Sequence, residues 1–250
     1  MAKPRMAIFD FACCEGCQLQ IINVNKEEEY RDLFSLVEPV QWREAMSEKN
    51  GEYDIAVVEG SITRAEDEER VKLIRDQADV LIAIGACATL GGVNRIKNNF
   101  SLQEVKAYVY GQAEHLSYLD IAPTKAVDEV VHVDYNVQGC PINKEEFTYI
   151  LRCLAKGIEP IIPNYPVCVE CKMQGNICRY EYGELCLGPV TRAGCNAPCP
   201  SANFWCFGCR GFVDNPKLDV AEQVMEQYDL SVQDLMQKML LFNSKQEQVK

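Results

Sequence analysis

The chain contains fourteen cysteines, and twelve of them fall into three groups of four. Each group includes one C-x-x-C pair, a spacing typical of metal-cluster ligands. Iron–sulfur clusters are held by sets of four cysteine thiolates and change charge state reversibly. Three such sets in one chain therefore predict a relay for electrons. The groups are Cys14, Cys17, Cys87 and Cys140; Cys168, Cys171, Cys178 and Cys186; and Cys195, Cys199, Cys206 and Cys209.

Other interpretations of these cysteines stay open. A single C-x-x-C pair is weak evidence, because thioredoxin-like dithiols and zinc sites share it. The last eight cysteines could form two zinc sites, and Cys14 and Cys17 could form a redox dithiol. Cys13 adjoins Cys14, but only Cys14-x-x-Cys17 has bidentate spacing. Cys13 is therefore interpreted as a thiol next to the ligands that does not bind metal itself, or as a residue that only fills space. Cys153 stands among apolar residues and is predicted to be a core cysteine.

The first part of the chain alternates between predicted strands and helices. Short apolar runs rich in β-branched residues suit buried parallel strands, and the stretches between them have a helical period. This alternation predicts a flavodoxin-like, doubly wound parallel sheet in an α/β domain. The fourth run would place His132 in the core. The predicted strands are residues 5–11, 54–59, 79–85 and 130–137, and the clearest predicted helices are residues 65–79 and 144–156.

The first group of cysteines maps onto the ends of those strands. Cys14 and Cys17 follow the first strand, Cys87 follows the third, and Cys140 follows the fourth. Because open α/β sheets bind ligands beyond the carboxyl ends of their strands, the four cysteines are expected in one crevice.

Two carboxylates belong to the same region. Glu15 lies between the first two cysteines, and Glu59 ends the second predicted strand. A carboxylate beside a cluster could carry protons coupled to electron flow or tune the cluster potential. The alternative is a hydrogen-bonded structural carboxylate. No other candidate catalytic residue is found.

The composition changes after the α/β part. We predict a flavodoxin-like domain at 1–157, an irregular cysteine-rich domain with two clusters at 158–213, and C-terminal helices with a tail at 214–250. The middle segment has many prolines and glycines and no periodic apolar pattern. Bound metal is therefore expected to supply much of its folding energy.

Composition also limits the partners. A formal net charge of −12 over 250 residues argues against a nucleic-acid surface, which needs basic patches. No apolar run approaches the roughly 20 residues that span a bilayer. Without a hydrophobic leader pattern the protein is expected in the cytoplasm, where cysteines more often bind metal than form disulfides.

Seven motifs together resemble the small subunit of [NiFe] hydrogenases. Within that family the chain is most similar to the cytoplasmic, multimeric, bidirectional class that includes sulfhydrogenases and NADP-linked enzymes. The resemblance extends from about residue 6 to residue 213. It is carried by FDFACCEGCQLQI, VVEGSI, IGACATLGG, QGCP, CVECKMQGNIC, CLGPVTRAGCNAPCPS and CFGCRGF.

The resemblance implies three [4Fe-4S] clusters. The group that begins with Cys14 would hold the proximal cluster, the group that begins with Cys195 the medial cluster, and the group that begins with Cys168 the distal cluster. Two residues depart from the periplasmic uptake enzymes of the family. Cys168 stands where those enzymes have a histidine, and Cys199 adds a fourth thiolate to the medial site. Both changes favour four-thiolate [4Fe-4S] sites.

The resemblance also implies partners. The nickel–iron centre is expected in a separate large subunit facing the crevice around Cys14 and Cys17, with Gly91 and Gly92 nearby. The cysteine-rich end should face a flavin or iron–sulfur subunit that reduces NAD(P). A deazaflavin coenzyme or a heterodisulfide reductase is the alternative acceptor. A respiratory complex I-type subunit and a zinc-stabilised interaction module are the rival identities.

Overall fold

A computed structural model describes residues 3–23, 33–47, 51–111 and 120–242, and all structural statements refer to these. The tail at 243–250 therefore lies outside the described residues. Five parallel strands form one sheet in the order β2-β1-β3-β4-β5, which is the flavodoxin-like order. The strands are β1 (Arg5–Asp10), β2 (Glu38–Trp42), β3 (Ile55–Glu59), β4 (Val80–Ile84) and β5 (Tyr135–Val137).

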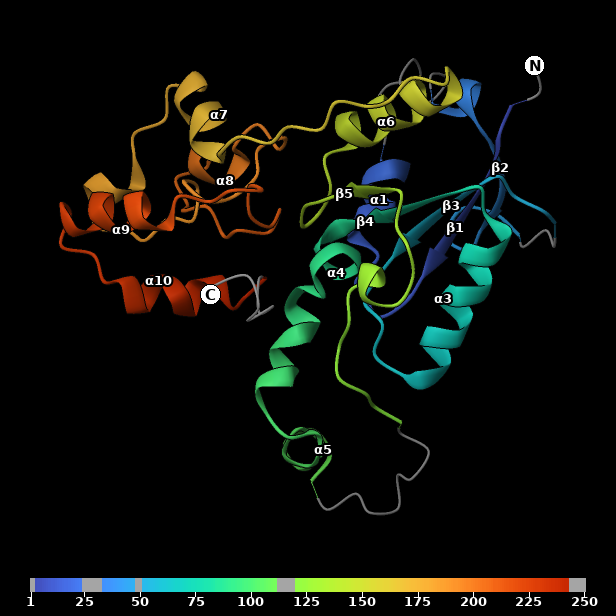
Figure 1. The fold of residues 1–250 in the computed structure, drawn as a ribbon, viewed down its shortest axis with the longest axis horizontal. Helices are drawn as coiled ribbons and strands as arrows, with labels where there is room; N and C mark the ends of the chain where they lie inside the picture. The colour runs from blue at the N-terminus through green and yellow to red at the C-terminus, as the bar shows by residue number, and fades with distance from the viewer. Residues whose placement is uncertain (1–2, 24–32, 48–50, 112–119, 243–250) are drawn as a thin grey trace.

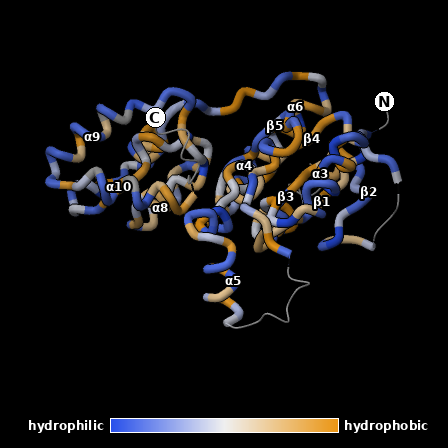
Figure 2. The backbone as a smooth tube through the Cα atoms, turned by 60° about the horizontal axis from the view of Figure 1, so that its bottom comes forward, coloured by the Kyte–Doolittle hydropathy of each residue, from blue (hydrophilic) through white to orange (hydrophobic). Residues whose placement is uncertain are grey.

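Helices cover both faces of the sheet (Figure 1). One core cluster joins Ile8, Val57 and Ile82 of the strands to α1 (Gly16–Ile22) and α6 (Lys144–Ala155). The alternate strand residues face α3 (Ala65–Gln77), which contributes Val71 and Ile74 to a second cluster. The central strands are buried on both faces, and Figure 2 shows them as the hydrophobic stretches of the sheet. The predicted α/β fold is confirmed.

Two features of the sheet differ from the expectation. The edge strand β2 was not predicted, because its sequence EPVQW contains a proline and lacks a continuous apolar run. An edge strand tolerates such residues since one side of it makes no ladder hydrogen bonds. The predicted strand 130–137 was too long: only Tyr135–Val137 pair with β4. The expected core position of His132 was therefore wrong, and its side chain is 81% exposed beside Asp134.

The short helix α4 (Gly85–Leu90) follows β4 directly, and a 3-10 helix (Gly92–Asn99) leads from it to α5 (Leu102–Tyr110). The cysteine-rich part lies beside the sheet as a second lobe (Figure 1). It contains α7 (Val167–Met173), α8 (Pro198–Ser201), α9 (Leu218–Glu226) and α10 (Val232–Met239).

This lobe has a small apolar core of its own. Val167, Leu187 and Val190 pack with Met225 of α9 and Leu235 of α10. The C-terminal helices thus share a core with the cysteine-rich segment. The domain boundaries at 157 and 213 remain predictions.

Candidate metal centres

The first cysteine group assembles at the carboxyl edge of the sheet. Cys14 precedes α1, Cys17 lies in α1, Cys87 lies in α4, and Cys140 follows β5. Burial raises the pKa of the Cys87 thiol to about 12, and Cys140 and Cys14 are close enough to contribute to this rise. Burial also raises the pKa of the Cys17 thiol, and Cys140 contributes in the same direction. Segments separated by 53 to 70 residues in the sequence are therefore neighbours here. Cys14 and Cys140 are exposed, so this group opens onto the surface.

Glycines let the backbone approach these sulfurs. A Cβ added to Gly85 would lie 2.5 Å from Cys17 Sγ, and one added to Gly92 would lie 2.9 Å from Cys87 Sγ. Both glycines have positive φ, at 80° and 56°. Only glycine adopts this conformation without strain. The backbone can therefore lie this close to the sulfurs only because Gly85 and Gly92 have no side chain.

Glu59 is buried beneath the first group, and only 2% of it is exposed. Its two carboxylate oxygens accept hydrogen bonds from the backbone N–H of Cys17 at 3.0 Å and of Gln18 at 3.2 Å. The carboxylate thus anchors the start of α1, where unpaired N–H groups favour an anion. This is the structural role that the sequence left as an alternative. A proton role for Glu59 stays a prediction.

Glu15 adopts a left-handed conformation, with φ of 61°, immediately before α1. Desolvation raises the pKa of its carboxyl, and the nearby carboxylates of Glu44 and Asp10 act in the same direction. The structure places Glu15 next to Cys14 along the chain and leaves its predicted proton or tuning role untested.

The second cysteine group lies around α7. Cys168 and Cys171 belong to this helix, and Cys178 and Cys186 follow it. Burial raises the pKa of the Cys168 thiol to about 12, and the charges of the other three cysteines act in the same direction. A Cβ on Gly188 would lie 3.2 Å from Cys168 Sγ and 3.5 Å from Cys186 Sγ. The four cysteines of this group therefore lie near one another, again against a glycine, and their role as cluster ligands stays a prediction.

The third cysteine group lines a cavity of about 350 Å³. Burial raises the pKa of the Cys195 and Cys206 thiols, and the nearby backbone of Ala197 and of Gly208 opposes this rise. Burial raises the pKa of the Cys209 thiol to about 12, with Cys195 and Cys199 close enough to contribute. The cavity wall includes Cys195, Cys199, Cys206 and Cys209, together with Cys140 of the first group.

The three groups are connected in series. Cys140 of the first group and Cys209 of the third line the same cavity, which links the two groups. Burial raises the pKa of the Cys209 thiol, and the nearby backbone of Cys140 opposes this rise. The backbone N–H of Cys206 donates to Cys186 Sγ at 3.1 Å and links the third group to the second. Along the described chain, no three potential ligands converge tightly enough to surround a single metal ion.

The two remaining cysteines lie outside these groups. Cys13 is half-buried near Cys87 and Glu59, and burial raises the pKa of its thiol to about 12. Cys153 on α6 is 8% exposed, as expected for a core cysteine. The role of Cys13 stays a prediction.

The sequence did not reveal the charged residues that hold the cysteine-rich loops. Arg210 is 1% exposed and forms a bidentate ion pair with Glu146 of α6, at 2.7 and 2.8 Å. Its guanidinium also donates to the carbonyl oxygens of Ala193 and Gln138. The side chain therefore ties the loop before Cys195 to the segment before Cys140. The only indication of this ion pair in the sequence was an arginine directly after Cys209. That position does not identify Glu146, which lies 64 residues away, as its partner.

Comparison with known protein families gives one match to a family model. Residues 14–154, more than half of the chain, match the model described as NADH ubiquinone oxidoreductase, 20 Kd subunit. The matched residues include the first cysteine group and end before the other two.

Characterised relatives are similar over most of the chain. The sulfhydrogenase 2 subunit delta of Pyrococcus furiosus is 37% identical, over 86% of this chain and 87% of the relative. A vhu F420-non-reducing hydrogenase subunit from Methanococcus voltae is 30% identical, over 85% of this chain and 83% of the relative. A solved NAD+-reducing [NiFe]-hydrogenase chain has 28% identity and a TM-score of 0.56 over 65% of this chain and 96% of its own.

The chain belongs to the hydrogenase small subunits of this 20 Kd subunit family. It is one part of a multi-subunit hydrogenase, an oxidoreductase. Its cysteine content fits the iron–sulfur chemistry of that family. Within the described part of the chain, helices of the length and hydropathy needed to cross a membrane are absent.

Proposed function

We propose that this chain is the electron-relay subunit of a [NiFe] hydrogenase and holds three [4Fe-4S] clusters. Electrons would pass between a nickel–iron centre in a large subunit and an acceptor subunit, during reversible hydrogen oxidation. The observation that carries the proposal is the serial connection of the cysteine groups, through Cys140 to Cys209 and through Cys206 to Cys186. A relay needs such a continuous order, whereas separate structural zinc sites do not.

The residues present fit clusters of this kind. Each group offers four thiols, and backbone amides or close glycines approach their sulfurs, as the surroundings of thiolate clusters require. When bound, a cluster supplies reversible one-electron storage. The proposed ligands are Cys14, Cys17, Cys87 and Cys140 for the proximal cluster, Cys195, Cys199, Cys206 and Cys209 for the medial cluster, and Cys168, Cys171, Cys178 and Cys186 for the distal cluster.

The two ends of the relay differ in their surroundings. The exposed positions of Cys14 and Cys140 support docking of the large subunit at the proximal end. At the distal end, α7 and the turn after it expose Val169, Met173 and Ile177, by 46%, 81% and 55%. Exposed apolar side chains of this size support an interface, and we assign it to the acceptor subunit.

The acceptor subunit is proposed to carry flavin or iron–sulfur centres and to reduce NAD(P) in the cytoplasm. The similarity to an NAD+-reducing enzyme supports this coupling. One observation favours a second candidate, an acceptor other than NAD(P). The NAD+-reducing chain covers 65% of this chain, whereas an F420-non-reducing hydrogenase subunit matches 85% of it. Hydrogen-dependent reduction of NAD+, NADP+, a deazaflavin and a heterodisulfide by the isolated complex will separate these acceptors.

Metal analysis of the anaerobically purified complex tests the cluster proposal. Three cubane clusters require about twelve iron and about twelve acid-labile sulfide per copy of this chain. Reduction should also produce electron paramagnetic resonance signals from more than one cluster. About two zinc per chain without sulfide would instead support the zinc-stabilised module.

Replacing Gly85 with alanine should remove the proximal cluster selectively. The new Cβ would lie 2.5 Å from Cys17 Sγ, so the thiol would have to leave its place in the group. The iron content should fall by about four per chain, since one [4Fe-4S] site is lost. Iron analysis and the resonance spectrum of the remaining clusters measure the effect.

Gly157→Ala is the matched control for this change. Gly157 also has positive φ, at 64°, but a Cβ there would meet nothing within 4 Å. Both variants therefore share a backbone strain of about 1–2 kcal/mol, and only Gly85→Ala crowds a sulfur. Equal iron loss in the two variants would mean that strain, and not the crevice, is responsible.

A further inference from the structure

Glu170 is a buried carboxylate between the second and third cysteine groups. It lies on α7 between Cys168 and Cys171, and 8% of the residue is exposed. Its carboxylate accepts hydrogen bonds from the loop that carries Cys195. Oε1 accepts a hydrogen bond from Gly194 N–H at 2.8 Å, and Oε2 accepts one from Asn196 N–H at 2.9 Å.

The loop that Glu170 holds is strained. Asn196 and Ala197 have φ of 59° and 49°, and Gly194 has φ of 115°. Residues other than glycine keep such a conformation only where surrounding contacts enforce it. Glu170 supplies two of these contacts, and Arg210 supplies a third through the Ala193 carbonyl. The position of Cys195 therefore depends on a side chain from the helix of the neighbouring group.

The same carboxylate lies close to the sulfur of the third group. Oε2 is 3.9 Å from Cys195 Sγ. Among the described residues, Glu170 bonds to these two amides and this thiol and forms no ion pair with lysine or arginine. Its negative charge therefore lies beside the third group without a bonded counterion. It raises the pKa of the Cys195 thiol, whereas the positive charge of Arg210 lowers it.

We propose that Glu170 sets the reduction potential of the medial site from the helix that carries the distal site. The proposal rests on the function proposed above. A negative charge beside a cluster opposes the addition of an electron, and net charge and hydrogen bonding are established determinants of cluster potential. Glu170 is thus a positioning residue that lowers the potential of the site held by Cys195, Cys199, Cys206 and Cys209.

Glu170→Gln tests this role in the complete, anaerobically purified complex. The amide keeps the shape of the side chain and removes its charge, and its single oxygen can accept only one of the two hydrogen bonds from Gly194 and Asn196. A redox titration followed by electron paramagnetic resonance should show the medial cluster easier to reduce. The ratio of reduced to oxidised cluster at a fixed potential should rise about tenfold or more, which equals about 59 mV for one electron. The proximal cluster should titrate as in the wild type.

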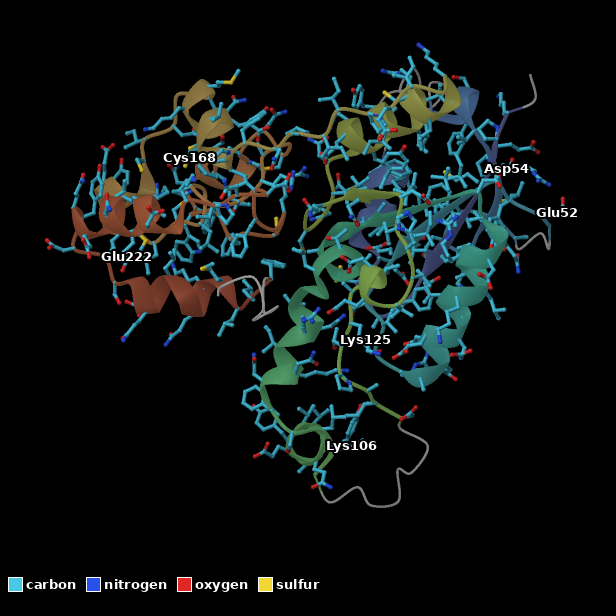
Figure 3. The ribbon with its side chains drawn as sticks, viewed as in Figure 1. Glu52, Asp54, Lys106, Lys125, Cys168 and Glu222 are labelled. Atoms are coloured by element: carbon cyan, nitrogen blue, oxygen red, sulfur yellow. The ribbon has the colours of Figure 1, made fainter. Side chains whose placement is uncertain are left out.

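Glu222→Gln is the matched control. Glu222 lies on α9 in the same lobe as Cys168, with its side chain exposed (Figure 3). The substitution makes the same change in net charge without touching either cysteine group. No cluster potential should change in this variant.

The outcomes are distinguishable. An unchanged medial potential in a Glu170→Gln protein with full iron content overturns the proposal. If that variant loses iron, Glu170→Asp is measured instead. Aspartate keeps the negative charge, but its side chain is one methylene shorter, so the charge lies farther from the third group. A smaller shift in the same direction then supports the proposal, and no shift overturns it. Absence of iron and sulfide from the wild-type complex would refute the proposed function itself.

Discussion

Cys206→Ala should cut electron delivery from hydrogen to the acceptor by about 10- to 100-fold. Cys206 is 7% exposed, lines the medial cavity, and links it to the distal group through its N–H bond to Cys186 Sγ. The change removes one of the four thiols of the medial site and keeps the backbone N–H that donates to Cys186, so it interrupts the relay in its middle by loss of a ligand. Isotope exchange between hydrogen gas and water should stay near the wild-type rate, because the proximal group does not include this residue. Acceptor reduction and isotope exchange are measured on the same purified complex.

Cys153→Ala is the control, because Cys153 is a buried cysteine outside the three groups. It should leave both activities and the iron content unchanged. Loss of both activities in Cys206→Ala would contradict the relay order and point to a damaged complex.

Arg210→Met should produce the largest loss of stability, about 3–5 kcal/mol, because it leaves a buried carboxylate without its partner. The side chains of Arg210 and Glu146 are 1% and 8% exposed, and the guanidinium also serves two carbonyl oxygens. The apparent free energy of unfolding from anaerobic urea titrations measures the loss. Medial iron should be lost at lower urea concentrations, since Arg210 adjoins Cys209 and holds the loop before Cys195.

A double variant identifies the cause. In Arg210→Met with Glu146→Leu neither charge of this buried pair remains, so part of the lost stability should return. Arg43→Met removes an exposed partner of Asp10 and should cost about 1 kcal/mol or less. A double variant whose loss equals the sum of the two single losses would show that the ion pair is not the reason for the effect.

Local patterns were sufficient for the α/β part of the fold. The apolar runs that became β1, β3 and β4 are continuous and β-branched, because these strands are buried on both faces. The edge strand β2 was missed, since a strand at the edge needs less apolar surface. β5 was predicted too long because Val130, Val131 and Val133 pack against the second core cluster without joining the sheet. His132 was misplaced for the same reason.

The sequence by itself determined the class of the sheet and the proximity of Cys14, Cys17, Cys87 and Cys140. It also predicted, as a hypothesis, which cysteines belong to each of the three thiol sets. It could do so because thiolate chemistry needs cysteines at short spacings and because parallel strands bring their carboxyl ends to one edge. Only the tertiary structure revealed the serial arrangement of the sets, the Arg210–Glu146 pair, and the hydrogen bonds of Glu170 to the Cys195 loop. These contacts join residues from 20 to 72 positions apart, and no local spacing encodes which buried charge meets which backbone group.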